Sequence, residues 1–194
     1  MCSSIFLVAY AVGIVVGAGL TTVSLATPAW RKLQDSHYSN YYGIFKSCAD
    51  SNLNSNQCLS DWENAPDWKK AALGCLAGAV ALCALGFAWS LVACCMCCCT
   101  SCLTPPLPIF AGLACVLDVA GVAVYSIITI IAVAERAGLK SGQDLGDVPT
   151  NIQALESKGD FGYSMWVGIA AIVVLFVDML IGAVLVKTAK ILPI

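Results

Sequence analysis

Four long runs of apolar residues, separated by polar segments, dominate the chain. They cover residues 5–26, 71–95, 109–134 and 163–186. Each run has roughly 20 or more mostly uncharged positions, enough for a helix rising about 1.5 Å per residue to cross a bilayer core of about 30 Å. The pattern predicts four transmembrane helices.

The residues outside these runs form two long loops, a short link and a short tail: 27–70, 135–162, 96–108 and 187–194. Because no internal repeat or linker divides the chain, we expect a single membrane domain over residues 1–194. A cleaved signal peptide is the alternative for the first run. Its length and the absence of Lys and Arg from residues 1–4 favour a transmembrane helix.

Composition narrows the class of protein. The chain is 59% hydrophobic and 11% charged, which is not the composition of a soluble globular domain. Its net charge of −2 and the lack of a basic run give no support for nucleic-acid binding. The sequence has no Gly-rich phosphate loop, and its one histidine, His37, has no catalytic partner at a suitable spacing. We therefore expect neither an enzyme nor a cofactor site.

Charge and cysteine placement disagree about orientation. The two long loops hold eight of the ten Lys and Arg residues, and a positive-inside count places such loops in the cytoplasm. However, each loop also carries five acidic residues, and Cys48 and Cys58 stand as an isolated pair in the first loop. The crowded cysteines lie on the other side of the membrane. Clustered thiols survive in the reducing cytosol, whereas disulfides persist outside it. We therefore expect both loops outside and both termini in the cytoplasm.

The first loop carries the most specific pattern. Trp30 directly follows the first apolar run, where a tryptophan commonly anchors in the membrane interface. Residues 36–42 are rich in aromatics and suit an exposed strand, and Gly43 permits a bend. Cys48 and Cys58 enclose a polar turn, so a hairpin pinned by a disulfide fits the spacing. An unlinked pair of cysteines is the alternative.

This segment resembles the signature of the claudin superfamily, which includes peripheral myelin proteins and calcium-channel gamma subunits. Trp30, then Gly43-Ile44-Phe45, then Cys48 and Cys58 are similar to the family's Trp, Gly-Leu-Trp and paired cysteines. Ile44 and Phe45 stand where the family has Leu and Trp. The four-helix layout, with a longer first loop and a shorter second loop, is also similar.

The resemblance implies a mainly α membrane protein, in which a left-handed four-helix bundle carries a small extracellular antiparallel β-sheet. Cys48 and Cys58 would bridge two of its strands. The implied function is adhesion and a paracellular barrier or ion path at plasma-membrane cell–cell junctions such as the tight junction. Copies in the same and in opposing membranes would associate. The alternative is an auxiliary regulatory subunit of an ion channel or receptor.

Loop charges are the candidates for tuning ion passage, because fixed charge in a narrow aqueous path selects by sign. Ordinary solvated charge is the alternative for each of them. The candidates are Asp35, Lys46, Asp50, Asp61 and Glu63.

Two features lie inside the apolar runs. The Gly13/Gly17 and Gly74/Gly78 pairs place small residues on one helix face and favour packing within the chain over dimerisation. Asp118 and Asp178 are acids at membrane depth, which we expect at comparable depths about one turn apart.

A proton or cation relay is one interpretation of the two acids. We favour acids that are protonated or hydrogen-bonded and fix the packing of the helices, with Tyr125, Ser126 or a backbone carbonyl as the partner. Without a second set of polar residues inside the membrane, a transport path would not be continuous.

A cysteine cluster follows the second run: Cys94, Cys95, Cys97, Cys98, Cys99 and Cys102. Juxtamembrane thiols of this kind are substrates for S-palmitoylation, which would attach the link to membrane lipids. A zinc site is the alternative, but its ligands normally come from two separated knuckles, so we predict no metal.

The C-terminal tail ends in an apolar residue, as ligands of PDZ scaffolds do. Pro193 lacks the N–H that strand addition uses, so the tail is a weak candidate for scaffold binding.

Overall fold

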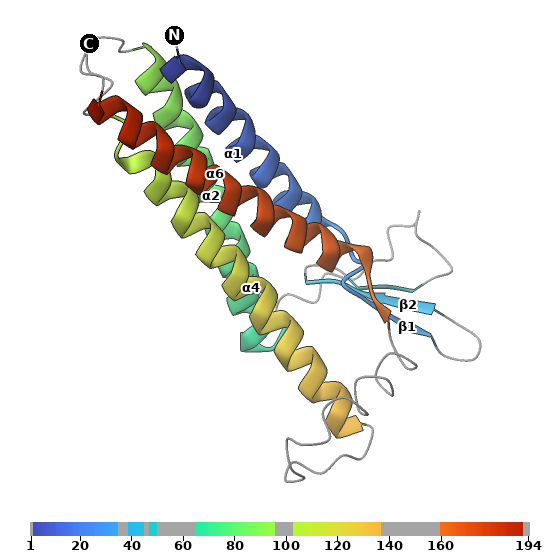
Figure 1. Cartoon of the computed structure of the whole chain (residues 1–194). Coiled ribbons are helices and arrows are strands. Elements are labelled where there is room, and N and C mark those ends of the chain that lie inside the picture. The colour runs from blue at the N-terminus through green and yellow to red at the C-terminus, as the bar shows by residue number, and fades with distance from the viewer. Residues whose placement is uncertain are drawn as a thin grey trace.

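The computed structural model describes residues 2–34, 39–44, 47–49, 65–95, 103–136 and 160–191. Its four long helices are α1 (Cys2–Ala26), α2 (Asp67–Cys95), α4 (Pro106–Arg136) and α6 (Tyr163–Ile191) (Figure 1). All four are long and apolar enough to span a membrane, which confirms the predicted multi-pass membrane protein.

All four helices extend beyond the apolar runs, and α1 already begins at Cys2. α2 begins at Asp67, where the Pro66 carbonyl accepts the Lys69 N–H at 2.9 Å and an acidic residue favours the first turn. α4 begins at Pro106, because proline is tolerated where its missing N–H would have no partner. α6 continues to Ile191, since no Gly or Pro interrupts it after the apolar run.

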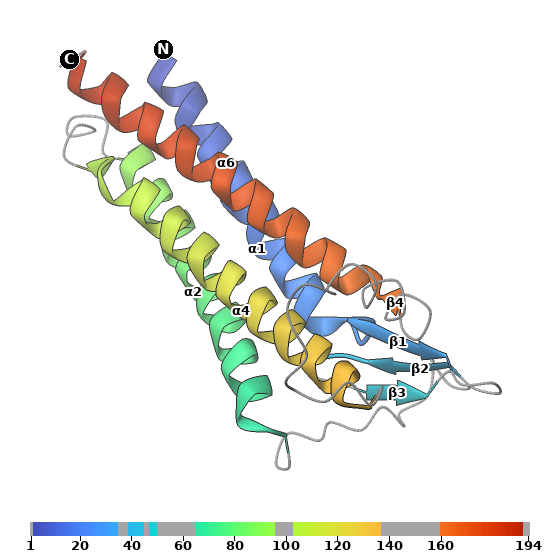
Figure 2. The ribbon, with the colours of Figure 1, turned by 60° about the horizontal axis from the view of Figure 1, so that its bottom comes forward.

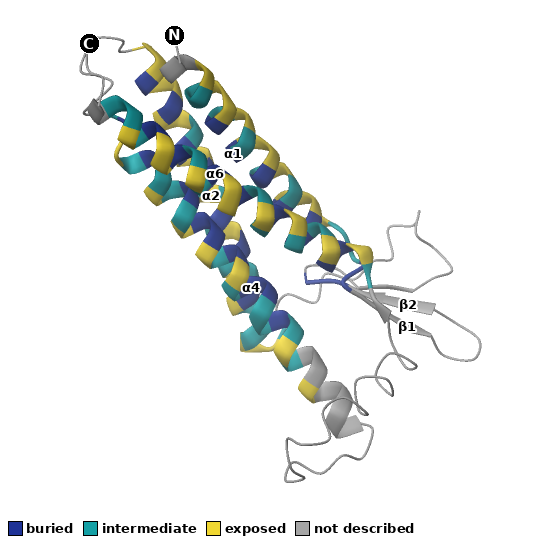
Figure 3. Ribbon diagram, viewed as in Figure 1, coloured by how far each residue is buried: buried dark blue, intermediate teal, exposed yellow. Residues whose placement is uncertain are grey.

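The helices form a ring in the order α1-α2-α4-α6, in which each helix packs against its two neighbours. Both chain termini lie at one end of the bundle, the terminal end, and the strands lie at the other, the strand end (Figures 1 and 2). Exposed positions follow the outward faces of the helices (Figure 3), and many are large and apolar. Such faces suit contact with lipid.

Four short strands lie at the strand end: β1 (Arg31–Gln34), β2 (Ser39–Tyr42), β3 (Ser47–Ala49) and β4 (Asp160–Phe161). They pair antiparallel in the order β3-β2-β1-β4, and Arg31 aligns with Tyr42 on one side and with Phe161 on the other. About half of the first long loop (35–38, 45–46 and 50–64) and most of the second (137–159) lie outside the described residues. The complete extracellular sheet and the left-handed bundle therefore stay predictions.

Glycines allow close approach at all four helix interfaces. At seven glycines, an added Cβ atom would lie within 3.4 Å of an atom of a neighbouring helix. They are Gly13 and Gly17 between α1 and α6, Gly78 and Gly121 between α2 and α4, Gly86 between α1 and α2, and Gly112 and Gly182 between α4 and α6. The predicted role in packing within the chain is confirmed for Gly13, Gly17 and Gly78. It is wrong for Gly74, which is exposed and has nothing within 4 Å of its Cβ position.

Candidate functional site

The strand end is built around a buried cluster, which we call the strand-end cluster. It comprises Trp30, Ile44, Ala72, Leu76, Val122, Tyr125 and Met165. Trp30 has 0% of its surface exposed, and its ring centroid lies 4.8 Å from that of Tyr125. The interpretation of Trp30 as an interface anchor is therefore wrong, because its ring is packed inside the protein.

Hydrogen bonds around Trp30 join the end of α1 to the beginning of α6. The indole Nε1 donates to the Ser24 carbonyl at 2.7 Å, and the Trp30 carbonyl accepts the Gly162 N–H at 3.0 Å. Ser164 adds two links, because its N–H donates to the Ala29 carbonyl at 3.1 Å and its carbonyl accepts the Ser24 hydroxyl at 2.9 Å.

Sequence reasoning missed Gly162 and Ser164, the two α6-end residues of this network. A Cβ atom on Gly162 would collide with the backbone carbonyl of Ala29, so only glycine fits there. The signal available in the sequence is the Gly162-Tyr163-Ser164 segment, which places a glycine and a serine at the start of the fourth apolar run.

The remaining motif residues are described in part. Gly43 and Ile44 are buried, and Ile44 belongs to the strand-end cluster. The backbone of Cys48 lies in β3 opposite Tyr41. Phe45, Cys58 and the five candidate loop charges lie outside the described residues, so the disulfide and the charge roles stay predictions. Those charges are Asp35, Lys46, Asp50, Asp61 and Glu63.

Two buried carboxyl groups occupy the middle of the bundle, and we call them the mid-bundle acids. Asp118 and Asp178 are each 1% exposed. Asp118 contacts Thr21 of α1, and Asp178 packs against Gly13 of the same helix. Eight residues separate Gly13 from Thr21, which is about 12 Å along a helix. The acids therefore lie just over two turns apart along α1, not one.

The partner of Asp118 also differs from the prediction. Asp118 Oδ2 lies 2.8 Å from Thr21 Oγ1, which is itself 3.1 Å from the Gly17 carbonyl. A threonine hydroxyl has only one proton to donate. Both contacts are hydrogen bonds if a protonated Asp118 donates to Thr21 and Thr21 donates to Gly17. Tyr125 instead packs against Trp30, and Ser126 lies 3.9 Å from the Met165 sulfur.

Asp178 is held by close packing against Gly13, that is, by shape. Neither of its oxygens, nor Asp118 Oδ1, has a hydrogen-bond partner among the described residues. Leu175 fills the space against Gly17, between the contacts that the two acids make on α1. An apolar side chain thus separates the acids, which supports a packing role over a relay.

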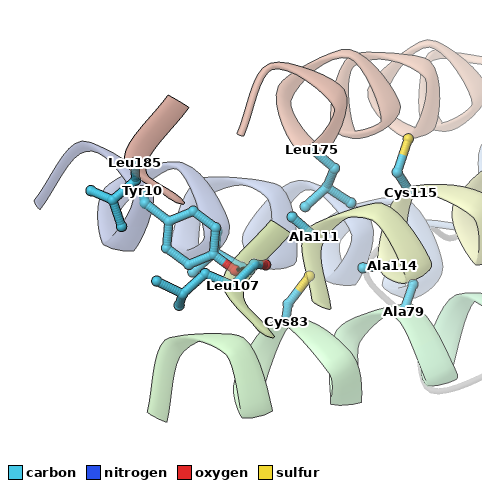
Figure 4. Packing of buried hydrophobic residues seen from close by; sticks show 10 residues of the cluster. Tyr10, Ala79, Cys83, Leu107, Ala111, Ala114, Cys115, Leu175 and Leu185 are labelled. Atoms are coloured by element: carbon cyan, nitrogen blue, oxygen red, sulfur yellow. Dashed lines mark hydrogen bonds between the residues drawn. The ribbon is translucent and has the colours of Figure 1, made fainter. Parts of the chain in front are cut away.

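Two hydrogen bonds cross the ring from α1 to α4. The Tyr10 hydroxyl (Figure 4) donates to the Leu107 carbonyl at 2.7 Å. Thr21 meets Asp118 eleven residues further along both helices. Because α1 and α4 run in the same direction, this equal spacing fixes their register.

The terminal end carries the cysteines. Cys94 and Cys95 are exposed in the last turn of α2. One turn earlier, the Trp89 indole donates to the Leu103 carbonyl at 2.9 Å, which ties α2 to the segment before α4. Cys97, Cys98, Cys99 and Cys102 lie outside the described residues. Within the described ranges, no group of three or more His, Cys, Asp or Glu side chains is placed to hold a metal ion.

No protein-family model matches the chain, and no curated protein matches it. The likeness to the claudin superfamily rests on the Trp30–Gly43–Cys48–Cys58 pattern and the four-helix layout, and membership stays a prediction.

Proposed function

We propose that this protein is a claudin-like cell–cell junction protein that contributes to adhesion and to a paracellular barrier or ion path. The observation that carries the proposal is the strand-end cluster. It binds the beginning of the first loop, the end of α1 and the beginning of α6 into one packed unit. In this proposal the strand end is extracellular, and both termini are cytoplasmic.

A packed strand end suits recognition between cells. Association costs conformational freedom, and a surface already held in place loses less of it on binding. Buried Trp30 and the Gly162 bond fix both chain segments that leave the strand end, so β1 and β4 start from defined positions. Copies in the same and the opposing membrane would meet through the outer loops and the proposed sheet, with Cys48 and Cys58 linked.

The loop charges would then select ions by sign. A fixed charge acts over about 8 Å at physiological ionic strength, which is comparable to the width of a narrow aqueous path. Asp50 and Glu63, two of the acids in the longer loop, are the residues that we choose for a test.

The test is charge reversal in a leaky epithelial layer that expresses the protein. Asp50→Lys or Glu63→Lys should lower the cation/anion permeability ratio, while Asp118→Asn, which changes an acid inside the bundle, should leave it unchanged. Surface labelling confirms that each variant reaches the membrane. Silent loop charges with a decisive Asp118 would place the function inside the bundle and overturn the proposal.

The second candidate is an auxiliary subunit of an ion channel or receptor, and one observation favours it. The outward face of α2 carries small residues at helical spacing: Ala71, Gly74, Ala77, Ala81 and Ala84. Small residues let another transmembrane helix approach closely. Co-purification with one channel, and altered gating of that channel without any change in paracellular permeability, would support this candidate.

The terminal end would be attached to the inner leaflet by S-palmitoylation of the cysteine cluster. Changing all six cysteines to Ser should sharply lower hydroxylamine-sensitive labelling, whereas stoichiometric zinc in the purified protein would favour the metal alternative. A PDZ scaffold at the C-terminal tail is a further proposed partner.

A further inference from the structure

An apolar groove lies between α1 and α2 near the terminal end, and one wall residue is a cysteine. Its volume is about 310 Å³. The α1 wall runs from Leu7 to Val16, and the α2 wall runs from Phe87 to Cys94. The one wall hydroxyl, on Ser90, donates to the Phe87 carbonyl at 2.7 Å, so it is already paired. The groove therefore offers a surface for hydrocarbon.

We propose that this groove holds a long acyl chain that is thioester-linked to Cys94. The inference rests on the proposed acylation of the cysteine cluster and adds which cysteine uses the groove and where its chain lies.

Geometry supports this occupant. Nine residues separate Leu7 from Val16, which is about 14 Å of helix and close to half of a bilayer core of about 30 Å. Cys94 is one residue from the end of α2, so its thiol lies at the boundary end of the groove while Phe87 lies deeper. A chain attached to Cys94 would enter at the membrane surface and run inward through one leaflet.

Attachment favours this chain over free lipid. A tethered chain is present at a high effective concentration beside the groove, whereas membrane lipids exchange freely. The neighbouring Cys95 is also exposed at the end of α2 but does not line the groove, so it serves as a matched control.

The chemistry is a transthioesterification with a long-chain acyl thioester as the donor. The Cys94 sulfur attacks the donor's carbonyl carbon and forms the new carbon–sulfur bond. The donor's carbon–sulfur bond breaks, and its thiolate leaves with the proton that Cys94 loses. No oxidant or reductant is needed.

The experiment labels cells that express the full chain with a palmitate analogue carrying a photoreactive group and an alkyne. Irradiation and peptide mass spectrometry then map crosslinks, and hydroxylamine-sensitive exchange measures acylation at Cys94 separately. Wild type and Cys95→Ser should give crosslinks to α1 between Leu7 and Val16, and Cys94→Ser should lose them. Ala11→Phe, which fills the groove, should keep the Cys94 thioester and lose the crosslinks.

Each other outcome overturns the inference in its own way. An unacylated Cys94 removes the attachment point, while labelling at other cysteines would leave acylation of the cluster standing. An acylated Cys94 without crosslinks to α1 would place its chain elsewhere. Crosslinks that persist in Cys94→Ser would assign the groove to a membrane lipid or another thioester. None of these results bears on the proposed junction function, which the permeability test decides.

Discussion

The strand-end cluster and the mid-bundle acids both bury polar groups, but they do so differently. Around Trp30, the indole N–H, the backbone N–H groups of Gly162 and Ser164, and the serine hydroxyls have partners at 2.7–3.1 Å. In the mid-bundle, three of the four carboxyl oxygens have no partner among the described residues. The strand end is defined by hydrogen bonds, and the middle is defined mainly by close packing against glycine.

This difference has a physical consequence. A buried polar group costs free energy when it loses its hydrogen-bond partner, so the strand-end network favours one arrangement. Asp178, which has no hydrogen-bond partner among the described residues, depends instead on the space that Gly13 leaves beside it. We therefore expect mutations at the strand end to act by breaking its hydrogen bonds and packing. Mutations in the middle of the bundle should act mainly by changing side-chain volume.

The largest effect is expected from Trp30→Ala. It empties a fully buried aromatic site and leaves the Ser24 carbonyl without the indole donor, which should lower the free energy of unfolding by about 3–5 kcal/mol. Titration of the purified protein with a denaturing detergent measures this loss. Trp166→Ala is the matched control, because Trp166 is 62% exposed and its loss should change stability by less than about 0.5 kcal/mol. Equal effects would contradict the buried position of Trp30.

The same contrast explains what the sequence could predict. Apolar runs report length directly, so all four helices were predictable. They do not report which side of a helix faces inward, because these helices are apolar all round. Gly74 and Gly78 therefore looked equivalent, although only Gly78 packs against α4.

Long-range partners were beyond the sequence for a related reason. The Trp30 ring packs against Tyr125, and Asp118 contacts Thr21. The two residues of each pair are more than 90 positions apart in the sequence. Tyr125 and Ser126, two of the predicted partners for the buried acids, lie on the same helix as Asp118, but side chains seven or eight positions on are two turns away. Only the ring order of the helices brings Thr21 to Asp118.

A moderate effect is expected from Gly13→Ala. The new methyl group would meet the Asp178 carboxyl group, whose carbon would lie 2.8 Å from it, and overpacking of this kind costs about 1–3 kcal/mol. Gly19→Ala is the control in the same helix, since nothing lies within 4 Å of its Cβ position, and it should be neutral. Adding Asp178→Ala to Gly13→Ala should restore part of the loss by freeing space. A loss that the second change leaves untouched would show that Asp178 is not held by this packing.

The smallest effect tests the one hydrogen bond of the mid-bundle acids. Thr21 and Thr22 both approach the carbonyl four residues earlier, at 3.1 and 2.7 Å, but only Thr21 is buried and meets Asp118. Thr21→Val should therefore destabilise the bundle more than Thr22→Val. Hydrogen bonds between membrane helices average about 0.6 kcal/mol and reach at most about 1.7, so a difference in this range is expected. A double-mutant cycle with Asp118→Leu isolates the pair, because the second substitution should cost nothing further at this bond once Thr21 is gone. Zero coupling would mean that Asp118, like Asp178, is held by shape alone, and the contrast between the two acids would disappear while the contrast with Trp30 would sharpen.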